Sequence, residues 1–375
     1  MRIVFTGGGT GGHFYPIIAV AQAIHKIVDE ERLIEPELFY FGPNEFDERA
    51  LFEEGLTFHQ IPAGKLRLYF SLKNITDAIK TFAGILKAIY TLFSIFPDVI
   101  FSKGGYASFP VLLAGRLFKI PIVIHESDTI PGRVSLWSAK FAKAIAISYP
   151  EASAYFPKEK TAFTGNPIRK ELINPERSGA HEFLKLEHNV PVILILGGSQ
   201  GAEKINDAII KSLKRLVESY QVIHQTGEAN FASVTEISNV ELEGNKYKGR
   251  YKPFPFLNNL ALRMSAGIAD VVLTRAGSTI FEIASWGIPS IIVPIPETIS
   301  RDQRTNAFAY AHSGAATVIE EANLDDDILT SQLAHLLESK DKREHMIKSA
   351  QSFARKDAAE KIARKLISVA LEHSV

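Results

Sequence analysis

A histidine follows a glycine-rich stretch near the beginning of the chain. Residues 5–16 read FTGGGTGGHFYP and stand between a short apolar run and an amphipathic one, where a strand would turn into a helix. Glycines there allow positive φ angles and let a ligand approach the main chain, and a helix start offers unpaired N–H groups to an anion or a sugar. We therefore expect a binding loop with His13, which titrates near neutral pH, beside the ligand.

The same glycines permit two other interpretations. Gly7, Gly9 and Gly12 satisfy the dinucleotide-binding pattern G-x-G-x-x-G, and a lone match of this kind often marks only a tight turn. A dinucleotide site also needs an acidic residue at the end of the second strand. The second expected strand, residues 38–41, runs into a glycine and a proline instead. A dinucleotide site is thus disfavoured, whereas a turn without a ligand stays open.

Polar side chains follow two later apolar runs. The turn SKGGYASFP, residues 102–110, follows one run, and HESDTIPGR, residues 125–133, follows the next. Glu126 could act as a base or bind a hydroxyl group. It could equally be a buried carboxylate that accepts hydrogen bonds from backbone N–H groups of a neighbouring loop, which we slightly prefer.

The second half of the chain carries groups suited to a nucleotide sugar. Glu282 lies one turn into the helix expected after TRAGS, where its carboxylate could accept hydrogen bonds from a ribose diol or merely favour the helix dipole. The segment SRDQRTNA, residues 300–307, supplies amides that can bind sugar hydroxyls. Arg169 ends the motif TGNPIR where the two halves join, and it could reach a phosphate or be simply solvated.

Alternating strands and helices must position these groups. β-Branched runs separated by segments with helical spacing predict parallel sheets covered on both faces. The runs form two series, and the second opens with a strand and GGSQGA, residues 197–202, as the first opens with its own glycines. Ligands of such sheets bind outside the carboxyl ends of the strands. The expected strands are residues 2–5, 38–41, 98–101, 122–124 and 144–147, then 192–196, 221–224, 271–273 and 290–293.

The expected fold class is α/β, with two doubly wound, Rossmann-like domains that face a central cleft. A chain of 375 residues is too long for one ordinary core. We place the first domain at residues 1–165 and the second at residues 166–349, with residues 174–191 as a linker region. Residues 350–375 have helical spacing and are expected to return to the first domain.

Composition excludes several classes of protein. The formal net charge is zero, so the chain lacks the general electrostatic footprint of a nucleic-acid-binding protein. Cysteine is absent, which excludes disulfides and thiolate metal sites. The chain begins with an expected strand rather than a secretory signal, and no uncharged apolar run approaches the ~18 residues of a transmembrane helix. We therefore expect a cytoplasmic protein.

Residues 71–97 predict an unusually apolar helix. Lys73, Lys80 and Lys87 recur along it at seven-residue intervals and so fall near one side. Such a helix could lie on an anionic bilayer surface. Its aliphatic face could equally pack on the sheet, with the lysines merely solvated.

Together these motifs resemble the MurG family of bacterial glycosyltransferases. The resemblance rests on GGGTGGHFYP, GGYASFP, HES with PGR, TGNPIR, GGSQGA, and RAGSTIFEIASWGIPSIIVP with DQRTNA, in the family's order and spacing. Members of the family move N-acetylglucosamine from UDP-N-acetylglucosamine onto the muramyl-pentapeptide diphosphate polyprenol of cell-wall synthesis. The resemblance therefore implies a peripheral enzyme at the cytoplasmic face of the membrane.

The resemblance also implies a GT-B fold, with the acceptor mainly on the first domain and the nucleotide sugar mainly on the second. It implies an inverting transfer without a metal or other cofactor, in which His13 is the general base for the acceptor's 4-hydroxyl group. The implied contacts of UDP-N-acetylglucosamine are Thr10, Gly11, Gly12, Arg169, Ser199, Leu257, Ser278, Glu282 and Gln303. The candidates for the acceptor or its diphosphate are Gly104, Gly105, Tyr106, Glu126 and Asp128.

Three features depart from the family pattern, and one of them is a loop after Arg275 that is one residue shorter than usual. The chain has HESD where the family usually has HEQN, so Asp128 replaces an amide and brings a negative charge near the diphosphate. Asp302 stands beside Gln303 where the family mostly has histidine or glutamine. Three alternatives remain: a UDP-N-acetylglucosamine 2-epimerase, another GT-B lipid glycosyltransferase, and a nucleotide-sugar-binding regulator without catalysis.

Overall fold

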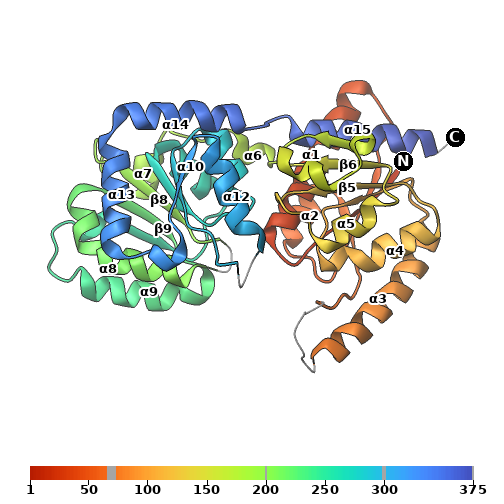
Figure 1. Ribbon diagram of the computed structural model, residues 1–375, viewed down its shortest axis with the longest axis horizontal. Coiled ribbons are helices and arrows are strands. Elements are labelled where there is room, and N and C mark those ends of the chain that lie inside the picture. Colours follow the sequence, from red (N-terminus) through yellow and green to blue (C-terminus); the bar gives the residue numbers. More distant parts are fainter. Residues whose placement is uncertain (66–72, 199–200, 298–300, 374–375) are drawn as a thin grey trace. The chain divides into compact units, whose positions relative to one another are not determined.

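The chain divides into two units, which are described separately. A computed structural model describes residues 1–65, 73–198, 201–297 and 301–373, with only the backbone described at residues 73, 301 and 302. Unit 1 comprises Met1–Arg169 and Arg355–Val375, and unit 2 comprises Lys170–Ala354 (Figure 1). These divisions lie a few residues after the boundaries expected at residues 165 and 349.

Unit 1 is built on a parallel sheet in the strand order β3-β2-β1-β4-β5-β6-β7. Successive residues of β1 point to opposite faces, so Ile3 and Phe5 join the core beneath α1 and α15, whereas Val4 joins the core beneath α3, α4 and α5. The strands are β1 (Arg2–Thr6), β2 (Glu37–Gly42), β3 (Leu56–Gln60), β4 (Val99–Ser102), β5 (Ile122–Glu126), β6 (Ala144–Ile147) and β7 (Thr161–Phe163). The helices are α1 (Gly11–Glu31), α2 (Glu48–Glu53), α3 (Lys73–Ile95), α4 (Phe109–Leu117), α5 (Arg133–Ala139) and α15 (Ala358–His373).

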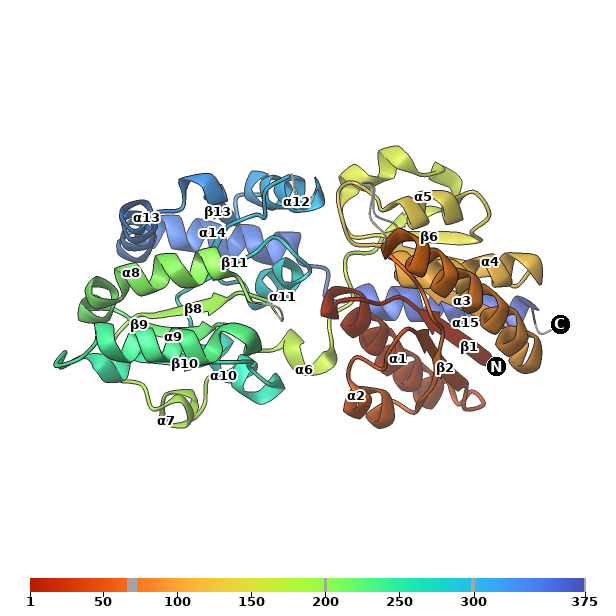
Figure 2. The same cartoon turned by 90° about the horizontal axis from the view of Figure 1, so that it is seen from below.

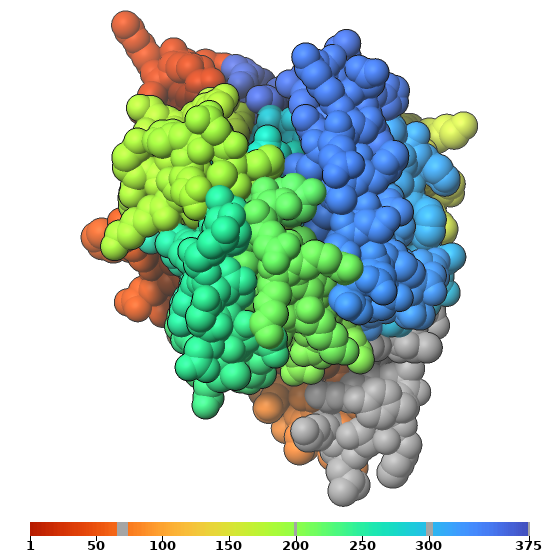
Figure 3. Space-filling view, turned by 90° about the vertical axis from the view of Figure 1, so that its left-hand side faces the viewer, coloured from red at the N-terminus to blue at the C-terminus, as the bar shows by residue number. Residues whose placement is uncertain are grey.

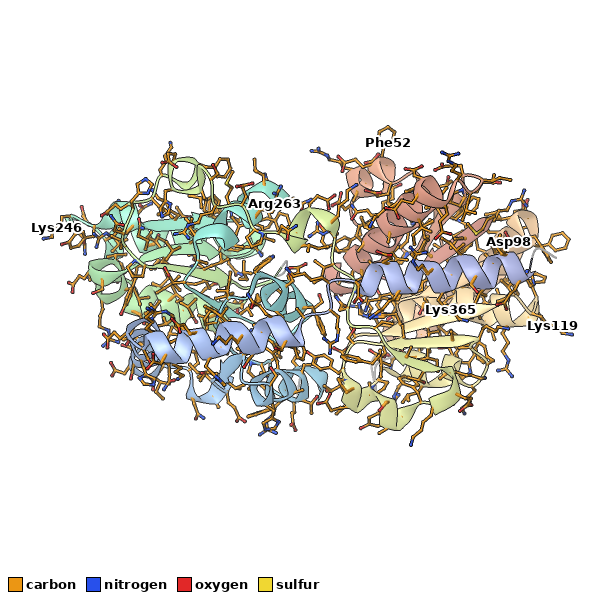
Figure 4. All side chains as sticks on the ribbon, turned by 90° about the horizontal axis from the view of Figure 1, so that it is seen from above. Phe52, Asp98, Lys119, Lys246, Arg263 and Lys365 are labelled. Carbon is orange, nitrogen blue, oxygen red and sulfur yellow. The ribbon has the colours of Figure 1, made fainter. Side chains whose placement is uncertain are left out.

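The C-terminal helix α15 completes unit 1. Its residues Ile362 and Leu366 are buried with the apolar face of α1, although more than 300 positions separate the two helices in sequence. Figure 4 shows α15 crossing this unit and labels Lys365, one of its exposed residues. Apolar residues recur in α15 at helical spacing, and this periodicity dictates which side it buries.

Unit 2 repeats the architecture, with a parallel sheet in the order β10-β9-β8-β11-β12-β13. Helices α8 and α13 cover one face of this sheet, and α11, α12 and α14 contribute to a second core. Figure 3 shows α13 and α14 in blue beside the green of α8 on the surface of this unit. The strands are β8 (Val192–Leu196), β9 (Gln221–Gln225), β10 (Tyr251–Phe254), β11 (Val271–Thr274), β12 (Ser290–Ile292) and β13 (Ala316–Val318). The helices are α6 (Lys170–Ile173), α7 (Ala180–Leu184), α8 (Glu203–Ser219), α9 (Glu228–Glu241), α10 (Asn259–Ile268), α11 (Thr279–Trp286), α12 (Arg301–His312), α13 (Asp326–Glu338) and α14 (Lys340–Phe353).

The interpretation of residues 174–191 as a linker was wrong. This segment contains α7, which packs against α10 inside unit 2. Ala180 and Leu184 of α7 are buried. Polar and proline-containing composition suggested a connection, but these few apolar side chains are enough to anchor the segment to the domain.

Candidate active site

His13 lies in the first turn of α1, where the glycine turn ends. Gly9 has a φ of 97°, which L-residues rarely adopt, and α1 then begins at Gly11. The His13 backbone N–H donates to the carbonyl of Thr10 over 3.1 Å, and its ring Nδ1 lies 3.0 Å from the hydroxyl of Thr10. When Nδ1–H donates to that hydroxyl, Nε2 carries the lone pair and can accept a proton.

The second glycine turn lies against this imidazole. Gly105 has a φ of 80°, and a Cβ at this position would stand 3.4 Å from His13 Nε2. A Cβ at Gly9 would likewise stand 3.0 Å from the ring of Tyr106. The structure therefore brings together the predicted residues Thr10–His13 and Gly104–Tyr106, because glycine alone permits their backbones to approach this closely.

The imidazole of His13 is uncharged at neutral pH. Burial, and to a smaller extent the positive charge of Lys103, lower its pKa to about 4. An uncharged imidazole is the form that a general base requires. The same shift makes it a weaker base than an exposed histidine, so its contribution depends on how well it is placed.

Lys103 is a site residue that the sequence analysis missed. Its side chain is 2% exposed, and its ammonium nitrogen has no hydrogen-bond partner among the residues that the structure describes. Burial lowers the pKa of Lys103 and the negative charges of Glu126 and Asp128 partly offset this effect, so that the pKa is about 8. The sequence does place this polar residue directly after the buried strand β4, and ligands of such sheets bind beyond the carboxyl ends of the strands. This position could have identified Lys103 as a site residue.

Glu126 holds the loop that follows β5. Its carboxylate accepts hydrogen bonds from the backbone N–H groups of Ser127 (2.8 Å), Asp128 (3.1 Å) and Gly132 (3.1 Å). The preferred reading of Glu126 as a buried carboxylate is thus confirmed. Burial and the neighbouring charge of Asp128 raise the pKa of Glu126.

Arg169 belongs to unit 1 and is nearly buried there. Its guanidinium lies 3.7 Å from the centre of the Tyr15 ring, and the Tyr15 hydroxyl donates to Asp47 over 3.2 Å. Tyr15 lies two residues after His13 in α1. The stacking therefore places Arg169 beside the first turns of this helix. The reading of Arg169 as a simply solvated side chain was wrong, because tertiary packing holds it.

Three predicted residues of unit 2, Ser278, Glu282 and Gln303, lie beyond the carboxyl ends of β11 and β12. Ser278 precedes α11, and Glu282 is partly exposed in its first turn. Gln303 lies near the start of α12 and accepts a hydrogen bond from the backbone N–H of Ile295 over 3.3 Å. Asn306 donates to the carbonyl of Ala276 over 3.4 Å and so ties α12 to the loop after β11. Ser199 and the side chain of Asp302 lie outside the described residues.

Leu257 follows β10 and so also lies beyond the carboxyl end of a strand. In the strand order, β10 is outermost on the side away from β12. Its side chain is 2% exposed, and its backbone N–H donates to Gln225 Oε1 over 3.0 Å. A ligand at this position would therefore contact the main chain of the loop more readily than the leucine side chain.

A separate polar cavity of about 310 Å³ lies in unit 2 near the amino end of β8. It is lined by residues that include His181, His188 and Val192, the first residue of β8. The predicted donor groups lie at the carboxyl ends of the strands, whereas this cavity adjoins an amino end. It therefore contains none of the predicted site residues.

Two Rossmann-like units, each with a glycine turn between its first strand and the helix that follows, form the GT-B fold. Comparison with known proteins gives the family. Residues 3–147 match the glycosyltransferase family 28 N-terminal domain, and residues 192–362 match the glycosyltransferase family 28 C-terminal domain. The chain belongs to glycosyltransferase family 28.

Curated relatives match nearly the whole chain. The UDP-N-acetylglucosamine–N-acetylmuramyl-(pentapeptide) pyrophosphoryl-undecaprenol N-acetylglucosamine transferase of Lachnoclostridium phytofermentans is 36% identical over 364 residues, which cover 96% of this chain and 97% of that protein. The transferase of the same name from Treponema denticola is 36% identical over 349 residues, covering 89% of this chain and 88% of the relative.

Solved structures share the fold. Acinetobacter baumannii MurG superposes with a TM-score of 0.70 at 23% identity, covering 98% of this chain and 99% of that one. The UDP-GlcNAc 2-epimerase of Neisseria meningitidis bound to UDP-GlcNAc superposes with a TM-score of 0.67 at 15% identity, covering 98% of this chain and 100% of that one. Transferases and epimerases thus share this fold, so the fold alone does not distinguish them.

Proposed function

We propose that this chain transfers N-acetylglucosamine from UDP-N-acetylglucosamine to the 4-hydroxyl group of a muramyl-pentapeptide diphosphate polyprenol, the step that converts lipid I to lipid II in peptidoglycan synthesis. The observation that carries the proposal is the uncharged His13, whose Nε2 lies at the second glycine turn. The relatives that are 36% identical over nearly the full length carry the name of this activity.

In the proposed reaction His13 Nε2 takes the proton of the acceptor's 4-hydroxyl group. The hydroxyl oxygen attacks the anomeric carbon of N-acetylglucosamine from the face opposite UDP, so one carbon–oxygen bond forms as the bond to UDP breaks. The configuration inverts, and no covalent enzyme intermediate is needed. Arg169 and backbone N–H groups at helix starts would stabilise the charge that grows on the departing diphosphate, in place of a metal.

The remaining proposed contacts follow the two units. Thr10, Gly11 and Gly12 would face the donor sugar and diphosphate, whereas Gly104, Gly105 and Tyr106 would face the acceptor. Glu282 would bind the ribose, and Gln303 the sugar hydroxyls. Glu126 would act indirectly, since its carboxylate already holds the loop that contains Asp128.

The outer face of α3 supports a peripheral membrane location. Helix α3 packs against α4 through Ala88 and Leu92, which are buried (Figures 1 and 2). Its opposite face carries a continuous stripe of apolar side chains that are 54–76% exposed, although most apolar residues of a water-soluble domain pack inside. The stripe consists of Ile75, Ile79, Phe82, Leu86, Tyr90 and Phe93.

This stripe supports the membrane-surface interpretation of the helix over the interpretation in which its apolar face only packs on the sheet. Segment Asn74–Ile95 is long and apolar enough to cross a membrane by composition, yet α3 lies along the surface of a folded unit. Lys80 and Lys87 are exposed beside the stripe by helical spacing. We propose that α3 rests on the cytoplasmic face of an anionic membrane, where the lipid-linked acceptor is found.

The experiment that tests the activity uses both substrates. The purified protein is incubated with UDP-N-acetylglucosamine and a short-prenyl muramyl-pentapeptide diphosphate, and the disaccharide product and UDP are measured. We expect UDP to be released only when the acceptor is present. Release of UDP without an acceptor, with formation of the 2-epimer, would instead establish the epimerase alternative, and binding without turnover would establish a regulator.

A further inference from the structure

Three neighbouring strands of unit 2 end in register at the proposed donor site. Gln225, the last residue of β9, pairs with Leu196 of β8 on one side and with Phe254 of β10 on the other. The loop after β8 contains Ser199 and the loop after β10 contains Leu257, and the family resemblance implies that Ser199 holds the diphosphate and that Leu257 lies at the uracil. Gln225 therefore stands between the two loops that would hold opposite ends of UDP.

The side-chain amide of Gln225 is bonded to both loops. Its Oε1 accepts a hydrogen bond from the Leu257 N–H over 3.0 Å, and its Nε2 donates to the carbonyl of Gly198 over 3.4 Å. The side chain is 6% exposed, so water competes little for these groups. The carbonyl of Gly198 also accepts from the Gly201 N–H over 3.1 Å, which closes the turn after β8.

The strand beneath Gln225 is held firmly. His224 is fully buried, with Nδ1 2.9 Å from the Tyr251 hydroxyl and Nε2 3.0 Å from Asn206 Oδ1. Asn206 also donates to the carbonyl of Thr226 over 3.1 Å. A Cβ at Gly201 would stand only 2.5 Å from that carbonyl, so the loop after β8 rests directly on the end of β9. Buried hydrogen bonds therefore hold the residues on both sides of Gln225 in place.

We propose that Gln225 is a positioning residue that couples the two loops, so that the uracil and diphosphate ends of UDP are bound at a fixed separation. This inference rests on the proposed function for the identity of the ligand. Glutamine suits the role because one side chain supplies both an acceptor and a donor. A glutamate would keep the acceptor for Leu257, lose the donor for Gly198 and place a negative charge beside the diphosphate loop.

The test compares two substitutions of Gln225 with one of Gln221. Gln221 lies at the amino end of the same strand, is fully buried, and bonds through its side chain to Glu187 and Val190. Gln221→Leu therefore breaks a similar set of buried hydrogen bonds far from the strand's carboxyl end. Titration calorimetry of uridine, UMP and UDP on the full-length proteins gives the affinities, and steady-state assays give KM and kcat.

We expect Gln225→Leu to weaken binding of both uridine and UDP by about tenfold, because it leaves a buried N–H unpaired and frees both loops. The loss should appear mainly in KM for UDP-N-acetylglucosamine. Gln225→Glu should keep the affinity for uridine and lose about tenfold for UDP, because only the diphosphate loop is released. Gln221→Leu should lower the melting temperature without changing either affinity.

Two results would overturn the inference. One is equal effects of Gln225→Leu and Gln221→Leu on UDP affinity, which would make Gln225 a merely structural residue. The other is tighter UDP binding by the Gln225 variants. This result would mean that the amide competes with the nucleotide for hydrogen bonds to Leu257 or Gly198. If the wild-type protein bound no uridine nucleotide at all, the proposed function itself would fail, and this outcome is separate from both.

Discussion

His13 is placed for proton transfer by two short contacts rather than by a strong intrinsic basicity. Thr10 orients Nδ1, and the absence of a side chain at Gly105 leaves room at Nε2. Burial keeps the ring uncharged at the expense of its affinity for a proton. The rate contribution of such a base comes from its geometry in the substrate complex.

Substitution of His13 should affect turnover far more than donor binding. His13→Ala should lower kcat by roughly 10²- to 10⁴-fold, the usual share of general base catalysis, and leave UDP affinity unchanged. Thr10→Val keeps the imidazole but removes its partner, so its loss should be smaller. Disaccharide formation measures the first effect and calorimetry the second. Full turnover by His13→Ala would show that another group takes the proton.

The pH dependence of kcat/KM should report the lowered pKa of His13. Because the pKa falls from 6.5 to about 4, the ring stays uncharged, and the enzyme active, until the pH approaches 4. Lys103→Met removes one of the two causes of this shift, so the acidic limb should move to higher pH. Circular dichroism over the same range checks that the protein remains folded. An acidic limb near 6.5 in the wild-type protein would contradict the assignment.

Lys103 explains how the chain tolerates Asp128. The buried ammonium lies near enough to Glu126 and Asp128 for their charges to raise its pKa. Its positive charge offsets the negative charge of Asp128, which the family's usual asparagine lacks. Removing Lys103 leaves the carboxylates of Glu126 and Asp128 uncompensated, whereas removing Asp128 leaves Lys103 still opposite Glu126.

A double-variant cycle tests this compensation. Lys103→Met should lower kcat/KM by roughly tenfold or more, since it leaves two neighbouring carboxylates without a cation, whereas Asp128→Asn should cost little because Glu126 still faces Lys103. The double variant should recover part of the loss of Lys103→Met, because only the Glu126 carboxylate then lacks a cation. Strictly additive losses in kcat/KM and melting temperature would show that the two residues act independently.

At the scale of elements, the sequence predicted the sheet centres and missed their edges. Each of the four strands that were not expected, β3, β7, β10 and β13, is the outermost strand of its sheet. Central strands of parallel sheets are buried on both faces and read as apolar runs, whereas LTFHQ, YKPF and TAF carry polar residues or a proline. The hydrophobic pattern alone could not identify them.

The polar residues of the site show the same limit. Glycine turns, His13 and Glu282 stand in motifs that a sequence displays directly. Lys103 and Gln225 are single polar residues at strand ends, and their roles depend on which strands lie side by side. Register between neighbouring strands arises from tertiary packing, so no local pattern revealed these two residues.

The apolar stripe of α3 predicts a specific loss of membrane binding. Phe82→Glu places a charge in the middle of the surface that we propose faces the bilayer, and it should reduce binding to vesicles that contain anionic phospholipid by about tenfold or more. Folding should be unaffected, because this side chain is 63% exposed. Vesicle co-sedimentation measures the binding.

A matched control comes from α2 of the same unit. Phe52 is 85% exposed and projects from the surface, as Figure 4 shows, yet it lies outside the stripe. Phe52→Glu should leave vesicle binding unchanged. If both variants bind vesicles as the wild-type protein does, α3 is not the membrane surface.

At the scale of the molecule, each unit has its own core, and α15 makes unit 1 discontinuous in sequence. Leu366 of α15 and Leu333 of α13 are both fully buried, the first in the core of unit 1 and the second in the core of unit 2. This pair allows the stability of the units to be changed one at a time.

Thermal unfolding should therefore show two transitions that respond to different changes. Leu366→Ala leaves a cavity that costs about 2–5 kcal/mol, so the transition of unit 1 should fall by roughly 4–20 °C while that of unit 2 stays in place. Leu333→Ala should do the converse. UDP binds mainly to unit 2 in the proposed function. By mass action, UDP should therefore raise chiefly the melting temperature of unit 2, the unit that Leu333→Ala destabilises. Differential scanning calorimetry measures all three effects. A single transition that moves with both substitutions would show that the units unfold as one, because the stability of one core would then depend on the other.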